Sequence, residues 1–371
     1  METPLETEKP RAYDSLRKEA ESIRVGVVMK KAIMNRRDFV GTLAATAAML
    51  EPAARGVAKP QEQRKSSGMK VGLYSITYLG VWYRGKALTL EEVIQRAKQY
   101  GYDGVEFDGK RPHANPLDLP TSRCRELRRI ADGEGIEIFG VAANNDFSSP
   151  IPEHRECQIC YVRELVRVTA DLGAKTLRLF FAWPGITKHP QVANYEIAKR
   201  VWRYTHRPFT TEETWAWCRE GLVESARYAA DAGVTLALQN HLPVITDHKD
   251  VLRMVREVNS PALKVSLDPW GLPVKTPEYI RQAARDVGPL QVLCHYGGVY
   301  ERGPDGKVIG ESHFRPFVAA MKEIGYQGYM SYELCSDPPK VGGQTAGIER
   351  AEKNAQLAAE FMRGLIKEQE V

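Results

Sequence analysis

"EGLVESARYAADAGVTLALQNH", residues 220–241, reads as a helix followed by a strand. Apolar residues recur at helical spacing up to Gly233, where the helix is expected to end. An alternation of apolar and small residues then predicts a buried strand, which finishes in Gln239, Asn240 and His241. Burying such polar groups without partners costs about a few kcal/mol each. Either this strand ends in solvent, or something is bound at its end.

The same unit of strand and helix repeats along the chain. Eight strands are expected, at 70–75, 103–107, 136–142, 175–182, 234–240, 263–268, 290–295 and 329–334. The segment between the first two opens with a Thr89-x-x-Glu92 capping box and closes on Gly101, which indicates a helix. A further helix, 353–368, closes the chain. Eight alternating units predict the α/β class and a single (β/α)8 TIM barrel.

The alternative fold is an open doubly wound sheet. It is disfavoured because neither GxGxxG nor GxxxxGK[ST] follows the first strand. The composition, 43% hydrophobic and 27% charged with mixed signs, argues against a mainly disordered chain. A net charge of +5 without a long basic run gives no indication of a nucleic-acid partner.

The N-terminal part differs from the rest. Arg36 and Arg37 precede a short apolar run that includes Phe39, as in a twin-arginine export signal. The alternative is an amphipathic helix with a chance arginine pair. We interpret 34–58 as the signal, which predicts an exported, periplasmic protein. The run is too short for an ordinary membrane span, so no stable span is expected after signal removal.

The other boundaries follow from this signal. Residues 1–33 are interpreted as an over-extended start or a disordered segment, 59–68 as a linker and 69–371 as the barrel. The six cysteines are scattered and predict no disulfide framework. Cys157 and Cys160 form a lone CxxC in a helical pattern, so both are expected to be small buried helix residues.

Polar side chains stand at the predicted strand ends, where a TIM barrel places its active site. Gln239, Asp268, His295 and Glu333 end four consecutive strands. Two carboxylates, an imidazole and an amide oxygen suit one divalent ion, Mn²⁺, Mg²⁺, Zn²⁺ or Fe²⁺, in an open site. Taken singly, Asp268 before a proline fits a turn and His295 fits a core histidine. Their joint placement favours a metal centre.

These residues resemble those of the xylose isomerase-like TIM-barrel superfamily of sugar isomerases and epimerases, over residues 70 to about 365. The resemblance implies a small carbohydrate substrate and one divalent metal held by a Glu, Asp, His and Glu, which map onto Gln239, Asp268, His295 and Glu333. In the family the two glutamates also transfer protons on opposite faces of the substrate carbon. Arg302 resembles the arginine of that family that contacts the substrate.

Gln239 departs from this pattern, because an amide coordinates a metal but cannot exchange a proton near neutral pH. Glu333 is therefore the expected base, giving a metal-bound enediolate, and His241 or Glu106 returns the proton. We expect Gln239 to face the metal, His241 to face the substrate and Asn240 to point away. The predicted function is sugar isomerisation or epimerisation. β-Elimination by a lyase or hydrolase acting on 3-keto-glycosides, and a catalytically silent sugar-binding barrel, stay open as alternatives.

An aromatic insertion, 183–210, follows the fourth predicted strand, and a loop of that length is expected to be functional. Several residues are expected on the same face as the metal centre to contact the sugar. They are Trp183, Trp270, Tyr296 and Asn144, with Trp82 and Tyr83 as further aromatic candidates.

Overall fold

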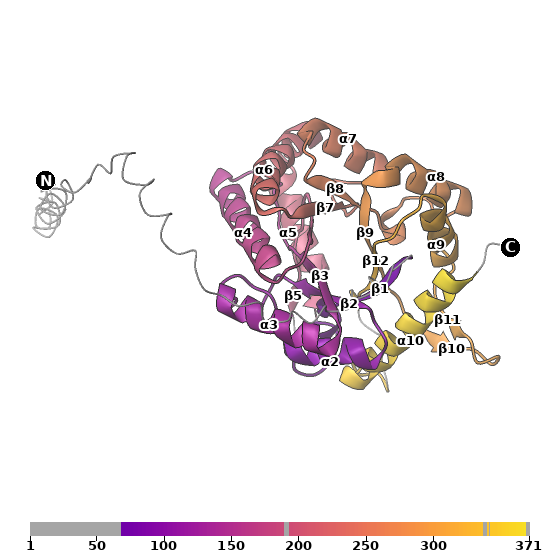
Figure 1. The fold of residues 1–371 in the computed structure, drawn as a ribbon. Helices are drawn as coiled ribbons and strands as arrows, with labels where there is room; N and C mark the ends of the chain where they lie inside the picture. The colour runs from indigo at the N-terminus through magenta and orange to yellow at the C-terminus, as the bar shows by residue number, and fades with distance from the viewer. Residues whose placement is uncertain (1–67, 189–192, 337–339, 341, 369–371) are drawn as a thin grey trace, which may run out of the picture. The chain divides into compact units, whose positions relative to one another are not determined.

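The structure is a computed structural model that describes residues 68–188, 193–336, 340 and 342–368. Eight parallel strands close into a barrel in the order β1-β12-β9-β8-β7-β4-β3-β2, which confirms the predicted TIM barrel (Figure 1). The strands are β1 (Lys70–Tyr74), β2 (Gly104–Asp108), β3 (Glu137–Ala142), β4 (Thr176–Leu179), β7 (Thr235–Gln239), β8 (Leu263–Ser266), β9 (Gln291–Tyr296) and β12 (Tyr329–Tyr332). The expected segment 1–33, the export signal 34–58 and nearly all of the linker 59–68 lie outside the described residues.

Each predicted strand overlaps one barrel strand, but several end one to three residues earlier than expected. At β4 and β8 a side chain takes over the hydrogen bonds of the sheet beyond the strand end. After β4, Asn145 Oδ1 accepts from the Phe180 backbone N–H at 3.0 Å and its Nδ2 donates to the Phe180 carbonyl at 2.8 Å. After β8, Asn240 Oδ1 accepts from the Asp268 backbone N–H at 2.7 Å. Asn240 therefore points away from the site, as predicted, and fixes the position of Asp268.

Helices surround the barrel in the described part of the chain. They are α2 (Leu90–Gln99), α3 (Thr121–Glu134), α4 (Pro152–Asp171), α6 (Thr211–Ala232), α7 (His248–Val258), α8 (Pro277–Val287), α9 (Phe314–Glu323) and α10 (Ile348–Lys367). The capping box of Thr89 and Glu92 is present at the start of α2. Gly233 ends α6 in the left-handed conformation, with φ of 66°, which a glycine adopts without a steric penalty.

The CxxC prediction was half right. Cys157 and Cys160 lie in α4, but both are exposed. The reason is that the fully buried residues of α4 begin only at Val162, and the first half of the helix packs on the core only through partly buried side chains such as Ile159.

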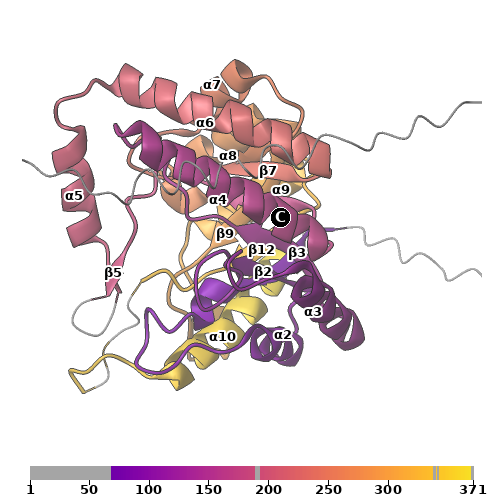
Figure 2. The same cartoon turned by 90° about the vertical axis from the view of Figure 1, so that its left-hand side faces the viewer.

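The predicted functional insertion forms its own small structure after β4. It contains the two-stranded pair β5 (Thr187–Lys188) and β6 (Ala193–Asn194), followed by α5 (Glu196–His206). Figure 2 shows α5 and β5 at one end of the barrel, apart from the surrounding helices. Trp202 Nε1 donates to Ser148 Oγ at 2.9 Å, and the Tyr195 hydroxyl donates to the Cys335 carbonyl at 2.9 Å. The loops that follow β3 and β12 therefore hold the insertion in place.

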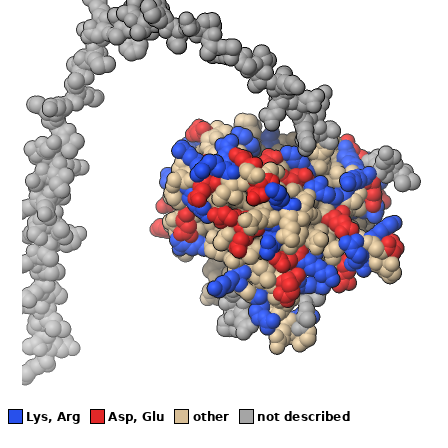
Figure 3. Space-filling view, turned by 60° about the horizontal axis from the view of Figure 1, so that its bottom comes forward, with Lys and Arg blue, Asp and Glu red and all other residues tan. Residues whose placement is uncertain are grey.

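The opposite, N-terminal end of the barrel is closed by aromatic packing. The rings of Phe139 and Tyr329 stack with centroids 3.7 Å apart, next to Ala237 and Leu293. On the face drawn in Figure 3, lysine and arginine side chains are interspersed with aspartate and glutamate. None of the helices in the described ranges has the length and apolar character needed to cross a membrane.

Candidate active site

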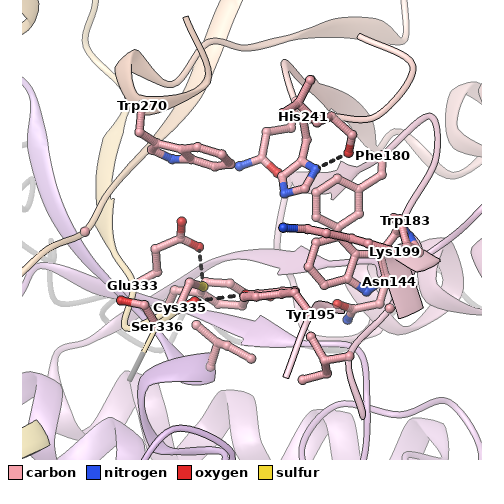
Figure 4. Close-up of a pocket in the computed structure, with 18 of the residues that line it drawn as sticks. Asn144, Phe180, Trp183, Tyr195, Lys199, His241, Trp270, Glu333, Cys335 and Ser336 are labelled. Atoms are coloured by element: carbon pink, nitrogen blue, oxygen red, sulfur yellow. Dashed lines mark hydrogen bonds between the residues drawn. The ribbon is translucent and has the colours of Figure 1, made fainter. Parts of the chain in front are cut away.

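A cavity of about 710 Å³ opens at the end of the barrel where the strands finish, and α5 forms part of its wall. Its floor contains polar side chains, among them Gln239, Glu333 and Arg178. Its sides are largely aromatic. Figure 4 shows Trp270 and His241 across the open space from Glu333, Cys335 and Tyr195.

The predicted metal ligands meet at the floor. The Gln239 amide nitrogen donates to Asp268 Oδ2 and lies 3.3 Å from His295 Nδ1. His295 Nδ1 is also 3.3 Å from Asp268 Oδ2, and the His295 backbone N–H donates to Asp268 Oδ1 at 2.6 Å. Asp268 and His295 are fully buried behind Gln239. The three strand ends therefore converge as the sequence indicated.

Glu106 does not face the cavity, which corrects its predicted place beside the substrate. Its Oε2 accepts from His295 Nε2 at 2.8 Å and from Ser331 Oγ at 2.9 Å, deep in the barrel. It thereby orients the imidazole. Burial acts to lower the pKa of His295, but Glu106 and then Asp268 raise it to about 10. The two carboxylates thus favour positive charge between them.

Gln239 shows how these residues fit a cation. Its Oε1 is buried and has no partner among the described residues. A half-turn of the amide would bring that oxygen to where the nitrogen now lies, beside Asp268 Oδ2 and His295 Nδ1. His295 Nε2 bonds to Glu106, so a cation that displaced the proton on Nδ1 would meet an imidazole already oriented in the carboxylate–histidine arrangement common in metal sites. The donor set therefore fits one divalent ion.

In the described residues, however, no group of three or more His, Cys, Asp or Glu side chains is arranged to hold a metal. Two features of the floor account for this. An amide stands at one of the predicted ligand positions, and the fourth predicted ligand, Glu333, is turned toward Cys335, whose Sγ lies 3.2 Å from Glu333 Oε2.

Glu333 is the carboxylate of the floor that reaches the cavity. Burial raises its pKa above the ordinary value, Asp268 acts in the same direction, and His295 and Arg178 oppose both. Such a carboxylate is a stronger base than an exposed glutamate. Its neighbour Cys335 also lines the cavity, and burial followed by the charge of Glu333 raises the pKa of that thiol.

Arg178 was not predicted and lies at the centre of the floor. Its Nη2 donates to the Tyr74 hydroxyl at 2.8 Å, and Nη1 donates to the Ala143 carbonyl at 3.2 Å. Burial acts to lower its pKa, but Tyr74, Glu106 and Glu333 outweigh burial, so the pKa is raised and the guanidinium stays charged. The available signal was an arginine in the middle of a strand that is otherwise apolar.

Asn144 lines the cavity as predicted, within a polar network on the side of β2 and β3. Its Nδ2 donates to Asp108 Oδ1 at 3.0 Å, and its Oδ1 accepts from Lys110 Nζ at 3.1 Å. The Tyr74 hydroxyl donates to Asp108 Oδ2 at 2.5 Å and so connects this network to Arg178. Lys110 and Tyr74 are further cavity residues that the sequence did not single out.

His241 lines the cavity, as predicted, inside a set of aromatic rings. Its ring centroid lies 4.8 Å from Phe180, 5.0 Å from Trp183 and 5.2 Å from Trp270, each at a steep angle. Burial lowers the pKa of His241 to about 4, although the bond between Nδ1 and the Leu242 carbonyl opposes the shift. The imidazole is therefore neutral at pH 7, with its proton on Nδ1 and a lone pair on Nε2.

Three predicted contact residues are not at the cavity. Tyr296 is buried against Tyr300, Tyr332 and Phe314, on the helix side of β9. Its neighbour His295 points inward, and successive strand residues point to opposite faces. Arg302, in β10 (Glu301–Arg302), pairs with Glu360 of α10 at 2.7 Å. Tyr83 is buried and bonds to backbone carbonyls.

Residues 94–365 match the protein family described as xylose isomerase-like TIM barrel. The chain belongs to this family. The match spans the strands that supply Glu106, Arg178, Gln239, Asp268, His295 and Glu333. The family assignment confirms the resemblance seen in the sequence.

Several proteins to which the chain is similar are named as sugar epimerases. The fructoselysine 3-epimerase of Escherichia coli O157:H7 is 23% identical over 312 residues, which are 81% of this chain and 100% of that protein. A D-psicose 3-epimerase crystallised with D-fructose superposes with a TM-score of 0.62 at 18% identity, covering 81% of this chain and 100% of the other. The 3-keto-D-glucoside 4-epimerase of E. coli superposes with a TM-score of 0.57 at 18% identity, covering 80% of this chain and 98% of the other. At these identities the two structures establish the fold.

Proposed function

We propose that this protein is a sugar isomerase or epimerase that moves a proton on a carbon next to a carbonyl, with Glu333 as the base. The observation that carries the proposal is the placement of Glu333. Its carboxylate is buried, reaches a large cavity at the catalytic end of the barrel and lies near the positive charge of Arg178. The three similar proteins described above are named as sugar epimerases, which supports the same class of reaction.

We also propose that Gln239, Asp268, His295 and Glu333 hold one divalent ion. When bound, such an ion supplies Lewis acidity that makes the C–H bond beside a carbonyl easier to ionise. Glu106 would hold the His295 ring with Nδ1 directed to the ligand position, through the bond between Nε2 and the carboxylate. The unpartnered oxygen of Gln239 supports this assignment.

The chain's own groups divide the work in the following way. Glu333 takes the proton, and burial keeps its carboxylate basic. Arg178 presents a fixed positive charge to the negative charge that develops on the sugar oxygen, at a site largely removed from water. Asn144 and Lys110 are placed to bind sugar hydroxyls.

Return of the proton distinguishes isomerisation from epimerisation. A single base can carry a proton between adjacent carbons on one face, whereas epimerisation needs a donor on the opposite face. Gln239 cannot donate a proton as a carboxylic acid would. His241 lies across the cavity from Glu333, but with a pKa near 4 its protonated form is scarce at pH 7 (Figure 4).

This asymmetry favours a second candidate function, β-elimination from a 3-keto-glycoside. Elimination needs one base. Glu333 would take the proton from C2, the electrons of that C–H bond would form a double bond between C1 and C2, and the aglycone would leave C1 with the electron pair of its C–O bond, to be protonated by the Glu333 carboxylic acid or by water. The similarity to a 3-keto-D-glucoside 4-epimerase supports a keto-glycoside as substrate class.

Product analysis separates the two candidates. Purified protein loaded with Mn²⁺ would be incubated with D-psicose and with phenyl 3-keto-D-glucoside, and the products followed by NMR and mass spectrometry. Isomerisation or epimerisation conserves mass, and elimination releases phenol. Conversion of neither probe nor of a broader ketose panel would contradict both candidates and favour the silent sugar-binding barrel.

We further propose that the protein is exported by the twin-arginine route, from the motif at Arg36 and Arg37. This route carries folded proteins and would allow the metal to be loaded before export. Replacing both arginines with lysine should retain the protein in the cytoplasm, measured by fractionation and blotting. An unchanged distribution would instead support an amphipathic N-terminal helix.

A further inference from the structure

The cavity has an outer part that the proposed proton transfer does not use. The reacting groups stand at the strand ends, while the surrounding wall comes from loops and from the insertion. Pockets of about 300–1,000 Å³ typically enclose drug-sized ligands. At about 710 Å³ this cavity has room for more than the sugar ring that Glu333 would act on.

A continuous series of rings lines this outer part, and we call it the aromatic arc: Trp82, Tyr195, Trp183, His241 and Trp270. Successive ring centroids along the arc are 5.1, 5.8, 5.0 and 5.2 Å apart. Aromatic surfaces of this kind bind flat or ring-shaped apolar groups. All five rings contribute to the cavity.

Two members of the arc carry unused hydrogen-bond donors. The indole nitrogens of Trp82 and Trp270 are buried, and neither has a partner among the described residues. A buried N–H without an acceptor is costly, and buried donors in folded proteins almost always have partners. Neither nitrogen is exposed to the open cavity in this structure, so a ligand oxygen would reach one of these N–H groups after the indole ring turns. The arc therefore combines apolar faces with donors, which suits a ring that bears oxygen atoms.

Two members of the arc, Tyr195 and Trp183, are held in place before any ligand arrives, and so is the helix α5 that adjoins them. The Tyr195 hydroxyl is fixed by the Cys335 carbonyl, and the ring of Trp183 stacks on Phe180 at 4.7 Å. Trp202 of α5 bonds to Ser148 and stacks on His206 at 4.0 Å. Preorganised rings lose little conformational freedom when a ligand binds.

We propose that the aromatic arc is a second subsite, which binds an oxygen-bearing ring attached to the sugar that reacts. The substrate is then a glycoside whose second ring is another sugar or a phenol, rather than a free monosaccharide. This inference rests on the proposed function only for the position of the first ring, above Glu333.

Calorimetric titration of the Mn²⁺-loaded protein tests the subsite with four probes: methyl, phenyl and 4-hydroxyphenyl β-D-glucoside, and cellobiose. We expect 4-hydroxyphenyl glucoside or cellobiose to bind at least about tenfold more tightly than methyl glucoside, from ring contacts together with hydrogen bonds. The tighter of these two identifies a phenol or a sugar as the natural second ring. Equal affinity for methyl glucoside and both of them would overturn the proposal.

Variants assign the preference to the arc. In Trp183→Ala, the affinities for the four probes should differ from one another by no more than about twofold. Trp217, a tryptophan of α6 outside the cavity, gives the control: Trp217→Ala should leave the preference for a second ring unchanged. Trp270→Phe keeps a ring but removes the N–H, so it should weaken only the probes whose second ring carries oxygen. A preference that survives Trp183→Ala would refute the subsite.

Failure of this inference is distinguishable from failure of the proposed function. If the protein incorporates deuterium into D-psicose in D₂O but binds methyl glucoside as tightly as the two-ring probes, the enzyme assignment stands and the subsite is refuted. Ring preference without exchange or turnover of any keto sugar would leave a sugar-binding barrel with two subsites.

Discussion

The two ends of this barrel are built differently. At the N-terminal end, Glu137 accepts from Lys70 at 2.7 Å and from the Tyr329 hydroxyl at 2.8 Å, and Asp103 accepts from Arg363 at 3.0 Å. Toward the C-terminal end, several buried polar atoms have no partner in the described part of the chain: Glu106 Oε1, Arg178 Nε, Gln239 Oε1 and the indole nitrogens of Trp82 and Trp270.

The difference separates stability from chemistry. Unsatisfied buried polar atoms cost folding free energy, so those that belong to cavity residues, such as Arg178 Nε and Gln239 Oε1, indicate groups whose cost a ligand would offset. In TIM barrels the C-terminal end carries the active site, whereas the other end serves stability. Mutations at the C-terminal end should therefore change turnover and metal content, whereas mutations at the N-terminal end should change the free energy of unfolding.

The largest expected effect is that of Glu333→Gln. This change keeps the shape and a coordinating oxygen but removes the base, so kcat should fall about 10²–10⁴-fold. The measurement is steady-state turnover of whichever keto sugar the wild type converts. Glu323→Gln, at the surface of α9, is the matched control and should retain activity. A Glu333→Gln enzyme with normal kcat would move the base to another residue.

Asp268→Ala should remove most bound divalent ion, and so should His295→Ala. Each would delete one ligand from a site with no spare protein donor, and even changes behind the ligands typically cost about 10–100-fold in affinity. Metal content after dialysis, measured by mass spectrometry with circular dichroism as a folding control, gives the answer. His154→Ala on the exposed part of α4 is the control. Wild-type metal content in both site variants would rule out the assignment.

Gln239→Glu should have a smaller effect than the preceding variants, and it should be a gain of metal affinity and activity rather than a loss. The new carboxylate can still bind the ion and adds a proton-transfer group, so metal affinity should be kept or increased and weak epimerase activity should appear. Chiral analysis of the product from a single sugar epimer detects it. Loss of both metal and activity would show that the amide itself is required.

Glu137→Gln, at the N-terminal end, should have the smallest effect. Its partner Lys70 is about one-third exposed, and pairs of this kind contribute about 0–1 kcal/mol to the free energy of unfolding. Denaturant unfolding should show that small loss, while kcat and metal content stay at wild-type values. A large drop in kcat would break the division between the two ends.

The sequence predicted the barrel and the convergence of Gln239, Asp268 and His295, because strand alternation places strand ends on one face. The error at Tyr296 was avoidable, since it directly follows the inward-pointing His295 in the same strand. Arg302 could not be placed, because its partner Glu360 comes from a distant helix. Arg178 was missed because a charge inside an apolar strand was not treated as a signal. The position of Glu106 behind His295 depends on a contact across the barrel that no local pattern contains.

The most direct test of the account is hydrogen exchange on the substrate carbon. Mn²⁺-loaded wild type and Glu333→Gln would be incubated in D₂O with D-psicose and with phenyl 3-keto-D-glucoside, and deuterium incorporation followed by NMR. The account predicts label at the carbon beside the carbonyl with wild type, and a rate at least about 10²-fold lower with Glu333→Gln. Incorporation at the wild-type rate by Glu333→Gln would contradict Glu333 as the base at the catalytic end of the barrel.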